Sequence, residues 1–348
     1  MTTEQLPPRT EEARLLEIAA DLPGERIACT STGRGQAAEQ LAAARPDARV
    51  HCWYLDAFRA ALAREHAGDL ANLTIDCRAD WPEAEIDLAC IPLSTSGEAE
   101  LSRELMQQAY ANLRVGGHLV VSVDNPKDQW LHEQMKGFDR SVKVRPFDDA
   151  TVYFVVKGTE LKKLKDFSCE LAFKDCDALV KLVTRPGVFS HRRLDNGARQ
   201  LLDAIDVYPE SRLIDIGCGA GAVALAAAMR EPSASVTAID SSARAIDCVR
   251  RGVALNGLEN LTAVLNHDGG ELPEAGFDMA LANPPYYADM RIAEHFVGIA
   301  KRVLRPGGRL VLVTKQPNWY RENLPEHLEE VEVFESRRYW IASGVKAE

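Results

Sequence analysis

The chain contains two copies of one segment, and this internal repeat constrains the fold more than any other feature. Five short blocks of the first half recur in the same order in the second half, at an offset that drifts only from 186 to 191 residues. The paired blocks are Ile27–Gly35 with Leu213–Gly221, Val50–Trp53 with Val236–Ile239, Leu73–Ile75 with Leu261–Ala263, Ile86–Ala89 with Phe277–Ala280, and Leu113–Val120 with Leu304–Val311. So regular a match indicates a duplicated domain.

Each copy alternates short apolar runs with helical stretches. In the second copy the predicted strands are Arg212–Ile216, Ser235–Asp240, Leu261–Asn266, Phe277–Ala282 and Gly308–Thr314, and the predicted helices are Ala222–Arg230, Ala243–Leu255 and Ile292–Val303. This alternation predicts a parallel, doubly wound sheet with helices on both faces. We therefore expect an α/β chain of two tandem Rossmann-like domains: a degenerate domain (1–156), a basic linker (157–206) and a catalytic domain (207–348).

The two copies differ in the residues that could carry chemistry. Where the second copy has Asp215 and Gly217, the first has Cys29 and Ser31. Two further replacements follow the same trend: Tyr54 replaces Asp240, and Pro92–Thr95 replaces Asn283–Tyr286. The first copy therefore retains the pattern of the sheet without the site, which predicts a scaffold or a substrate-binding module.

A glycine-rich turn after the first strand of the second copy predicts a nucleoside site. Glycines let the chain turn sharply and let a ligand approach the backbone, at the sheet edge where doubly wound folds bind ligands. We expect this turn and the acids after the next two strands to bind the cofactor: Asp215, Gly217, Gly219, Gly221, Asp240 and Asp268. Asp240 is placed to accept both ribose hydroxyls, and Asp268 to accept from an adenine amino group.

The same glycines also fit the nicotinamide-dinucleotide fingerprint, which has an acid about 20 residues further on. Three features oppose that interpretation. Asp215 suits a cationic amino-acid group and is badly placed beside a pyrophosphate, no His/Lys pair for hydride transfer stands out, and Asn283–Tyr286 would have no role. Methyl transfer from an amino-acid-bearing nucleoside explains all three.

The sequence Asn283-Pro284-Pro285-Tyr286 follows an apolar run and suits the orientation of a planar amino group. An exocyclic nitrogen is a poor nucleophile because its lone pair is delocalised into the ring. An amide oxygen and a backbone carbonyl can each accept one N–H bond and turn the lone pair toward a methyl donor. The prolines stiffen the turn and the aromatic ring can stack on a base. The plain alternative is an Asn-Pro turn after a strand.

The segment before the second copy combines an aromatic ring with cations. Phe189, His191, Arg192 and Arg193 form the pairing expected where a flipped base and its phosphates reach a site, although a simple domain connector is the alternative. From Lys157 to Arg193 there are nine Lys/Arg and five acidic residues, within a chain whose net charge is −11. A basic segment of this kind indicates either nucleic-acid contact or a solvated linker.

Composition excludes several other classes. No apolar run approaches the ~20 residues that span a bilayer, and the first residues lack the features of a secretory signal. The eight cysteines are scattered without Cys-x-x-Cys pairs or clustered histidines, which argues against a metal site and for reduced thiols. We expect a cytoplasmic chain with no membrane or metal partner.

At this point the residues carry a resemblance to a known family. The second copy resembles class I S-adenosylmethionine-dependent methyltransferases, and the chain from about Glu25 onward resembles the tandem-domain ribosomal RNA guanine-N2 methyltransferases of the small-subunit methyltransferase C type. Gly187–Ser190 and Leu194-Asp195-x-Gly197 add to the match. The resemblance implies S-adenosylmethionine as cofactor, 16S ribosomal RNA or the small subunit as partner, and Asn283, Pro284 and Tyr286 at the target base, with Pro285 beside them.

One departure keeps the target open. The family usually has Phe-His after the prolines, whereas this chain has Tyr286-Tyr287, as do amino-adenine and glutamine-amide methyltransferases. The leading hypothesis is guanine-N2 methylation of ribosomal RNA. The alternatives are an N6-adenine or protein-glutamine methyltransferase, and a non-catalytic ribosome-assembly protein that binds RNA.

Overall fold

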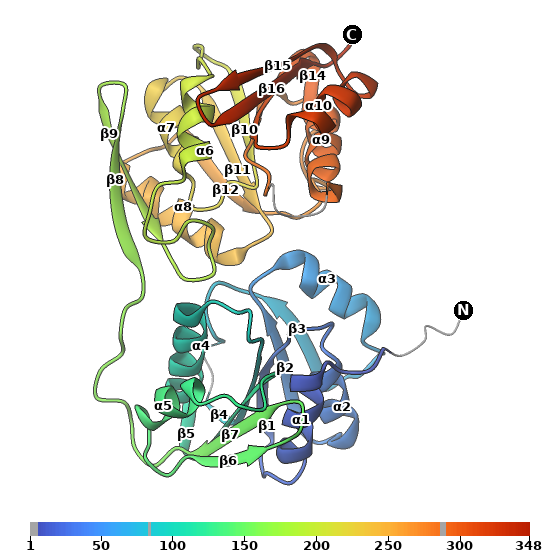
Figure 1. The fold of residues 1–348 in the computed structure, drawn as a ribbon, viewed down its shortest axis with the longest axis vertical. Coiled ribbons are helices and arrows are strands. Elements are labelled where there is room, and N and C mark those ends of the chain that lie inside the picture. Colours follow the sequence, from blue (N-terminus) through green and yellow to red (C-terminus); the bar gives the residue numbers. More distant parts are fainter. Residues whose placement is uncertain (1–5, 83–84, 286–289) are drawn as a thin grey trace. The chain divides into compact units, whose positions relative to one another are not determined.

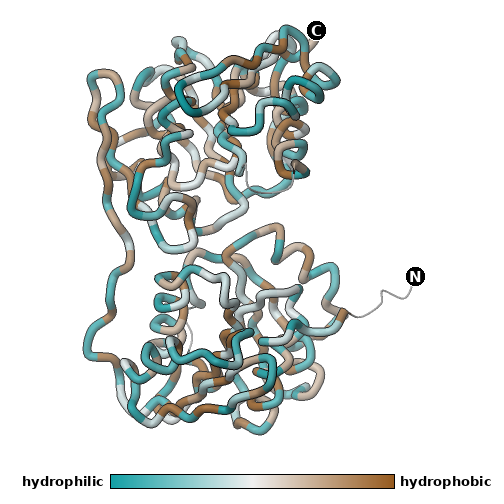
Figure 2. The backbone as a smooth tube through the Cα atoms, viewed as in Figure 1, coloured by the Kyte–Doolittle hydropathy of each residue, from teal (hydrophilic) through white to brown (hydrophobic). Residues whose placement is uncertain are grey.

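The computed structural model describes residues 6–82, 85–285 and 290–348. The chain divides into two compact units, Met1–Phe167 and Ser168–Glu348, each built around a seven-stranded sheet (Figure 1). Each sheet is covered on both faces by its own apolar clusters, and among the described residues each cluster belongs to one unit. Figure 2 shows that hydrophobic residues are concentrated in the central strands of each unit.

The first unit has the strand order β3-β2-β1-β4-β5-β7-β6. Its strands are β1 (Arg26–Thr30), β2 (Arg49–Tyr54), β3 (Leu73–Cys77), β4 (Ile86–Leu93), β5 (Leu113–Val123), β6 (Lys143–Pro146) and β7 (Thr151–Val156). Its helices are α1 (Thr10–Ala19), α2 (Gln36–Ala44), α3 (Ala57–His66), α4 (Ala99–Asn112) and α5 (Trp130–Lys136).

The second unit repeats this topology as β12-β11-β10-β13-β14-β16-β15. Its sheet strands are β10 (Arg212–Ile216), β11 (Ser235–Asp240), β12 (Leu261–Leu265), β13 (Phe277–Ala282), β14 (Leu304–Thr314), β15 (Glu329–Ser336) and β16 (Tyr339–Val345). The other elements are the strands β8 (Cys169–Asp175) and β9 (Ala178–Thr184), the helices α6 (Asn196–Asp203), α7 (Ala222–Arg230), α8 (Ala243–Asn256), α9 (Arg291–Val303) and α10 (Pro317–Asn323), and the 3-10 helix η1 (Leu324–Glu326).

The predicted fold class, two doubly wound Rossmann-like domains, is confirmed, and the shared strand order fits an internal duplication. The sheets are mixed, however, because β7 and β16 run antiparallel to β5 and β14. The strands predicted in the second copy are parallel, as expected, and the antiparallel strands at the edge of the sheet were not predicted. The edge strand β15 carries glutamates among its apolar residues and is largely exposed, so it lacks the continuous apolar run of a buried parallel strand.

The segment 157–206, predicted to be a linker, contains regular structure. The boundary between the units falls after Phe167, and β8, β9 and α6 belong to the second unit. The hairpin is held because its apolar residues Phe173, Val180 and Leu182 are buried in one cluster with α7 and α8. Asp175 at its tip also accepts two hydrogen bonds from the guanidinium of Arg230, at 2.8 and 2.9 Å.

Within the described ranges, no helix is both long enough and apolar enough to cross a lipid bilayer.

Candidate active site

The carboxyl ends of β10, β11 and β13 lie side by side at one edge of the second sheet, because these strands are parallel neighbours. Doubly wound folds bind their ligands at this edge. The glycine turn follows β10, Asp240 is the last residue of β11, and Asn283 follows β13 directly. The topology therefore brings together residues that are up to 68 positions apart in the sequence, counted from Asp215 to Asn283.

The turn after β10 is built from three glycines with left-handed backbones, Gly217 (φ 70°), Gly219 (φ 54°) and Gly221 (φ 85°). Side chains disfavour this conformation. A Cβ at Gly217 would lie 2.5 Å from the ring of Phe296, so packing also excludes a side chain there. A Cβ at Gly219 would meet no described atom within 4 Å. Gly219 therefore presents bare backbone to open space, where a ligand can come close.

One pocket gathers six of the predicted site residues, and the other described ones are not part of its lining. The volume of this pocket is about 500 Å³, including the part that opens to solvent. It is lined by the glycine turn, the start of α7, Asn283 and part of the loop before α6: Leu182, Phe189, Ser190, Arg193, Leu194, Asp195, Ala198, Asp215, Gly217, Cys218, Gly219, Ala220, Ala222, Val223 and Asn283.

Asp215 is a buried carboxylate at the base of this pocket. Its side chain is 3% exposed, and its Oδ2 accepts a hydrogen bond of 3.2 Å from the backbone N–H of Ala224 in α7. Burial raises the pKa of Asp215 to about 7, against the opposing effect of the Ala224 N–H, and the charge of Asp240 adds to the rise. Such a carboxylate is poised to ionise when a cation binds beside it.

Asp240 ties the glycine turn to β11. Its Oδ2 accepts from the backbone N–H of Gly219 at 2.9 Å, and its Oδ1 accepts from the N–H of Ser242 at 2.8 Å. Each carboxylate oxygen can accept more than one hydrogen bond, so ribose hydroxyls would add to these contacts.

Asp268 lies in a tight turn after β12. Its Oδ1 accepts from the N–H of Gly270 at 2.8 Å, and this bond holds the pKa of Asp268 below its usual value. The side chain of Asn266 supports the turn by accepting from the N–H groups of Asp268 and Gly269. Asp268 is exposed, which leaves its other oxygen available to a ligand.

Asn283 is half-buried, and its Nδ2 donates to Oδ2 of Asp195 at 2.8 Å. Pro284 is buried and Pro285 is half-buried. Tyr286, predicted to stack on the target base, lies outside the described residues.

The loop Gly187–Asp195, which we call the approach loop, delivers side chains to the same pocket. Phe189 is 44% exposed and lines the pocket together with Arg193. His191 is instead engaged within the protein, since its Nδ1 lies 2.9 Å from Oγ1 of Thr184. The backbone N–H of Arg192 donates to the same hydroxyl at 3.2 Å, which fixes the loop while the Arg192 side chain stays exposed.

Sequence reasoning assigned no role to Asp195 or Cys218, although both line the pocket. Asp195 is the N-cap of α6, and an Asp before a helical stretch is the signal that could have found it. Cys218 lies between Gly217 and Gly219 of the turn and lines the pocket with them.

The equivalent turn of the first unit is filled by the protein itself. The buried carboxylate of Glu12 in α1 accepts hydrogen bonds from the N–H groups of Thr32 and Gly33, and from the hydroxyl of Ser31. Cys29, which replaces Asp215, is 1% exposed. The carboxylate of Glu12 therefore occupies the turn of the first unit, whereas the corresponding turn of the second unit lines an open pocket.

Comparison with known proteins agrees with this geometry. The Methyltransferase small domain family matches residues 179–343. The ribosomal RNA small subunit methyltransferase C of Pseudomonas syringae pv. syringae is 30% identical over 319 residues, covering 86% of this chain and 89% of that protein. The chain belongs to the ribosomal RNA small subunit methyltransferase C family.

Other members of the methyltransferase C family show the same likeness. The protein of Hahella chejuensis is 35% identical over 191 residues, which cover 53% of this chain and 55% of that protein. The solved T. thermophilus 16S rRNA N2 G1207 methyltransferase, in complex with AdoMet and guanosine, has a TM-score of 0.79 at 20% identity. The alignment covers 97% of this chain and 92% of that one, so the fold is shared over both units.

Proposed function

We propose that this chain transfers a methyl group from S-adenosylmethionine to the exocyclic N2 of a guanine in 16S ribosomal RNA, in the cytoplasm. The observation that carries the proposal is the placement of the Asn283 amide in the same pocket as Asp215 and the glycine turn. Membership of the methyltransferase C family supports the reaction and the RNA substrate.

The pocket fits the proposed cofactor. S-adenosylmethionine supplies a methyl group on a sulfonium centre, together with a cationic amino-acid group and an adenosine. Asp215 offers a buried carboxylate for the cationic end, and Gly219 offers open backbone for close approach. Asp240, at the end of the neighbouring strand, would receive the ribose, as Asp268 would the adenine.

The reaction needs positioning more than a strong base. An amino group whose lone pair is delocalised reacts only when its N–H bonds are held by acceptors, so that the lone pair faces the methyl group. The Asn283 Oδ1 is one such acceptor, and the backbone carbonyl of Pro284 is the proposed second. Phe189 of the approach loop is exposed beside the pocket and offers a face on which a base can stack.

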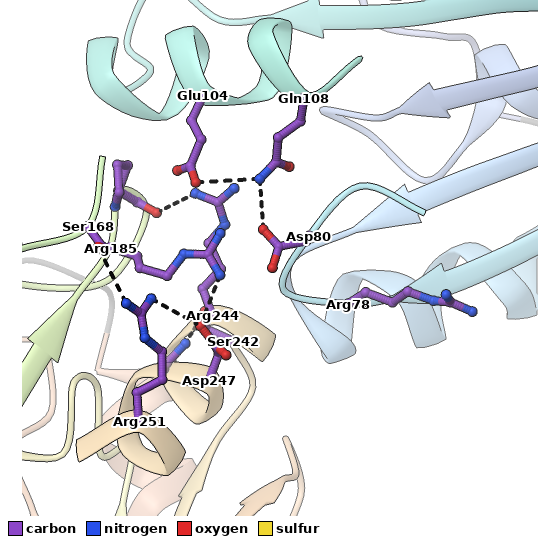
Figure 3. A network of polar contacts seen from close by, with 12 residues as sticks. Arg78, Asp80, Glu104, Gln108, Ser168, Arg185, Ser242, Arg244, Asp247 and Arg251 are labelled. Carbon is purple, nitrogen blue, oxygen red and sulfur yellow. Dashed lines mark hydrogen bonds and ion pairs between the residues drawn. The ribbon is translucent and has the colours of Figure 1, made fainter. Parts of the chain in front are cut away.

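Most cations of the segment Lys157–Arg193 lie at the surface, but two are buried and bind groups within the protein. Lys157 is 1% exposed and donates to the carbonyls of Ala111 and Leu113. Arg185 is also buried and binds Asp247 of α8 at 2.9 Å, beside Arg251 (Figure 3). The other seven of the nine are exposed, and we propose that they contact phosphates: Lys162, Lys163, Lys165, Lys174, Lys181, Arg192 and Arg193.

The proposal predicts which ribosomal RNA is labelled. Incubation with methyl-labelled S-adenosylmethionine and separated ribosomal RNAs should transfer the label to 16S RNA and leave 23S RNA unlabelled. Free 16S RNA and small subunits should be compared in the same assay, because either could be the substrate. Label in 23S RNA alone, or in protein alone, would contradict the proposal.

The raised pKa of Asp215 predicts a pH-dependent affinity for the cofactor. A group with a pKa of about 7 is mostly protonated at pH 5.5, and it must ionise to pair with a cation. The dissociation constant should therefore fall roughly tenfold between pH 5.5 and 7. Calorimetry would measure this change. The α-amino group of the ligand stays cationic between pH 5.5 and 7, because α-amino groups titrate at about 7.7–8.0.

Asp215→Asn is the matched control. Its affinity should be weaker at pH 7 and nearly independent of pH, whereas a flat profile for the wild type would contradict the assigned role.

The unliganded Asp215→Asn variant should also be more stable than the wild type above pH 7. The pKa of Asp215 in the folded state lies above the ordinary value of an aspartate, so burying the charged form costs stability as pH rises from about 4 to 7. The full cost is up to roughly 4 kcal/mol.

A further inference from the structure

An asparagine amide has two different ends, and only one of them suits the proposed reaction. Its oxygen accepts hydrogen bonds and can hold the amino group of a base, whereas its NH2 group only donates and would repel that amino group. Asn283 therefore works only if its side chain is kept from turning over by about 180°. The contacts of Asn283 show which neighbour prevents this.

The Nδ2 of Asn283 donates to Oδ2 of Asp195 at 2.8 Å. An ionised carboxylate only accepts, so the amide can face it only through its nitrogen. The Oδ1 of Asn283 can then accept a hydrogen bond from the amino group of a base in the pocket. We propose that Asp195 is the positioning residue that fixes the orientation of the Asn283 amide. This inference rests on the proposed function of Asn283.

Asp195 is itself held in place by α6. Its Oδ2 also accepts a hydrogen bond of 2.9 Å from the backbone N–H of Ala198, as the N-cap of that helix. A carboxylate at this position is stabilised by the free N–H groups of the first turn and by the helix dipole. Leu201 and Leu202 of α6 are buried in the core, so the carboxylate sits on a rigid element.

Gly197 provides an independent sign that the structure makes room for this contact. A Cβ at this position would lie 2.7 Å from Oδ2 of Asp195 and 2.9 Å from Oδ1 of Asn283. Real Cβ contacts are not that short, so any side chain here would push the two groups apart. Glycine weakens a helix, and its presence in the first turn of α6 is explained by the space that the amide occupies.

Two variants of Asp195 separate positioning from helix capping. Asp195→Ser keeps a good N-cap for α6, but its hydroxyl ends one bond short of the carboxylate oxygens and loses Asn283. Asp195→Asn keeps both the cap and a carbonyl oxygen that can accept from Asn283. With 16S RNA we expect kcat to fall roughly tenfold or more in Asp195→Ser and to stay within about threefold in Asp195→Asn. Melting temperature, cofactor affinity and KM for RNA should change little in both.

A double-mutant cycle with Asn283→Ala tests whether Asp195 acts through Asn283. Once Asn283 is gone, Asp195→Ser should lower kcat no further. Equal losses in the two backgrounds would overturn the proposal, as would wild-type kcat in Asp195→Ser or an equal loss in Asp195→Asn. If Asp195→Ser folds poorly, Gly197→Ala should lower kcat in the same way while the helix is retained, and normal kcat in that variant would overturn the proposal.

Different measurements test the reaction and the role of Asp195. The identity of the methylated product in the wild type reports on the proposed function. The ratio of kcat between variants reports on Asp195, and it can be measured on whichever amino group the wild type methylates.

Discussion

Asn283→Ala is expected to lower turnover on 16S RNA by roughly a hundredfold or more while leaving the affinity for S-adenosylmethionine nearly unchanged. The loss is typical of removing one aimed polar group from a site. The amide follows β13 and lines the pocket, whereas the proposed cofactor contacts come from the turn after β10 and from Asp240. Single-turnover methyl transfer and calorimetry on the same preparation would measure both quantities.

Ser94→Ala in the first unit is a suitable control for Asn283→Ala, because the sequence repeat pairs residues 92–95 with 283–286. Its turnover at saturating RNA should equal that of the wild type. Near-normal turnover in Asn283→Ala would show that this amide does not orient the nucleophile, and the account of the site would then fail.

Removal of the first unit is expected to abolish most activity on 16S RNA without abolishing cofactor binding. The fragment 168–348 retains the whole pocket and its own apolar core, so it should bind one S-adenosylmethionine with the affinity of the full chain. The full chain should also bind only one, because Glu12 fills the corresponding turn of the first unit. A large folded RNA binds chiefly through phosphates over a wide surface, and the fragment lacks part of that surface.

The fragment must start at Ser168, because a start at residue 180 would remove β8 from the hairpin. We expect its affinity for 16S RNA to be at least roughly tenfold weaker, with a shallower dependence of log K on log salt, since fewer phosphates are neutralised. Filter binding at several salt concentrations, together with methyl transfer, would measure this. Full activity of the fragment on 16S RNA would reduce the first unit to a stabilising role.

The elements that the sequence predicted best are those buried in the second sheet. Predicted strands and helices such as Arg212–Ile216 and Ala222–Arg230 coincide with β10 and α7, because buried parallel strands leave apolar runs of characteristic length. The predictions missed β15 and β16, and they took the hairpin and α6 for a linker. The hairpin and β15 are partly exposed, and charged residues interrupt their apolar pattern, whereas β16 is mostly buried and has no charged residue.

The site was predictable where it depended on topology alone. Residues that follow parallel neighbouring strands must meet at one sheet edge, and Asp215 and Asn283 line one pocket there. The contact between Asp195 and Asn283 joins residues 88 positions apart through a helix cap, and no local pattern indicates such a pairing. Likewise, the sequence counts Lys157 and Arg185 as ordinary cations, and only their burial shows that they support the fold.

The central claim is that this pocket methylates the exocyclic N2 of guanine in 16S RNA. Its most direct test is nucleoside mass spectrometry of unmodified 16S RNA, free and in small subunits, after incubation with the full chain and S-adenosylmethionine. The account predicts N2-methylguanosine as the product, formed roughly a hundredfold or more slowly when Asn283→Ala replaces the wild type under the same conditions. N6-methyladenosine in the RNA, or methylglutamine in a ribosomal protein with unmodified RNA, would contradict it.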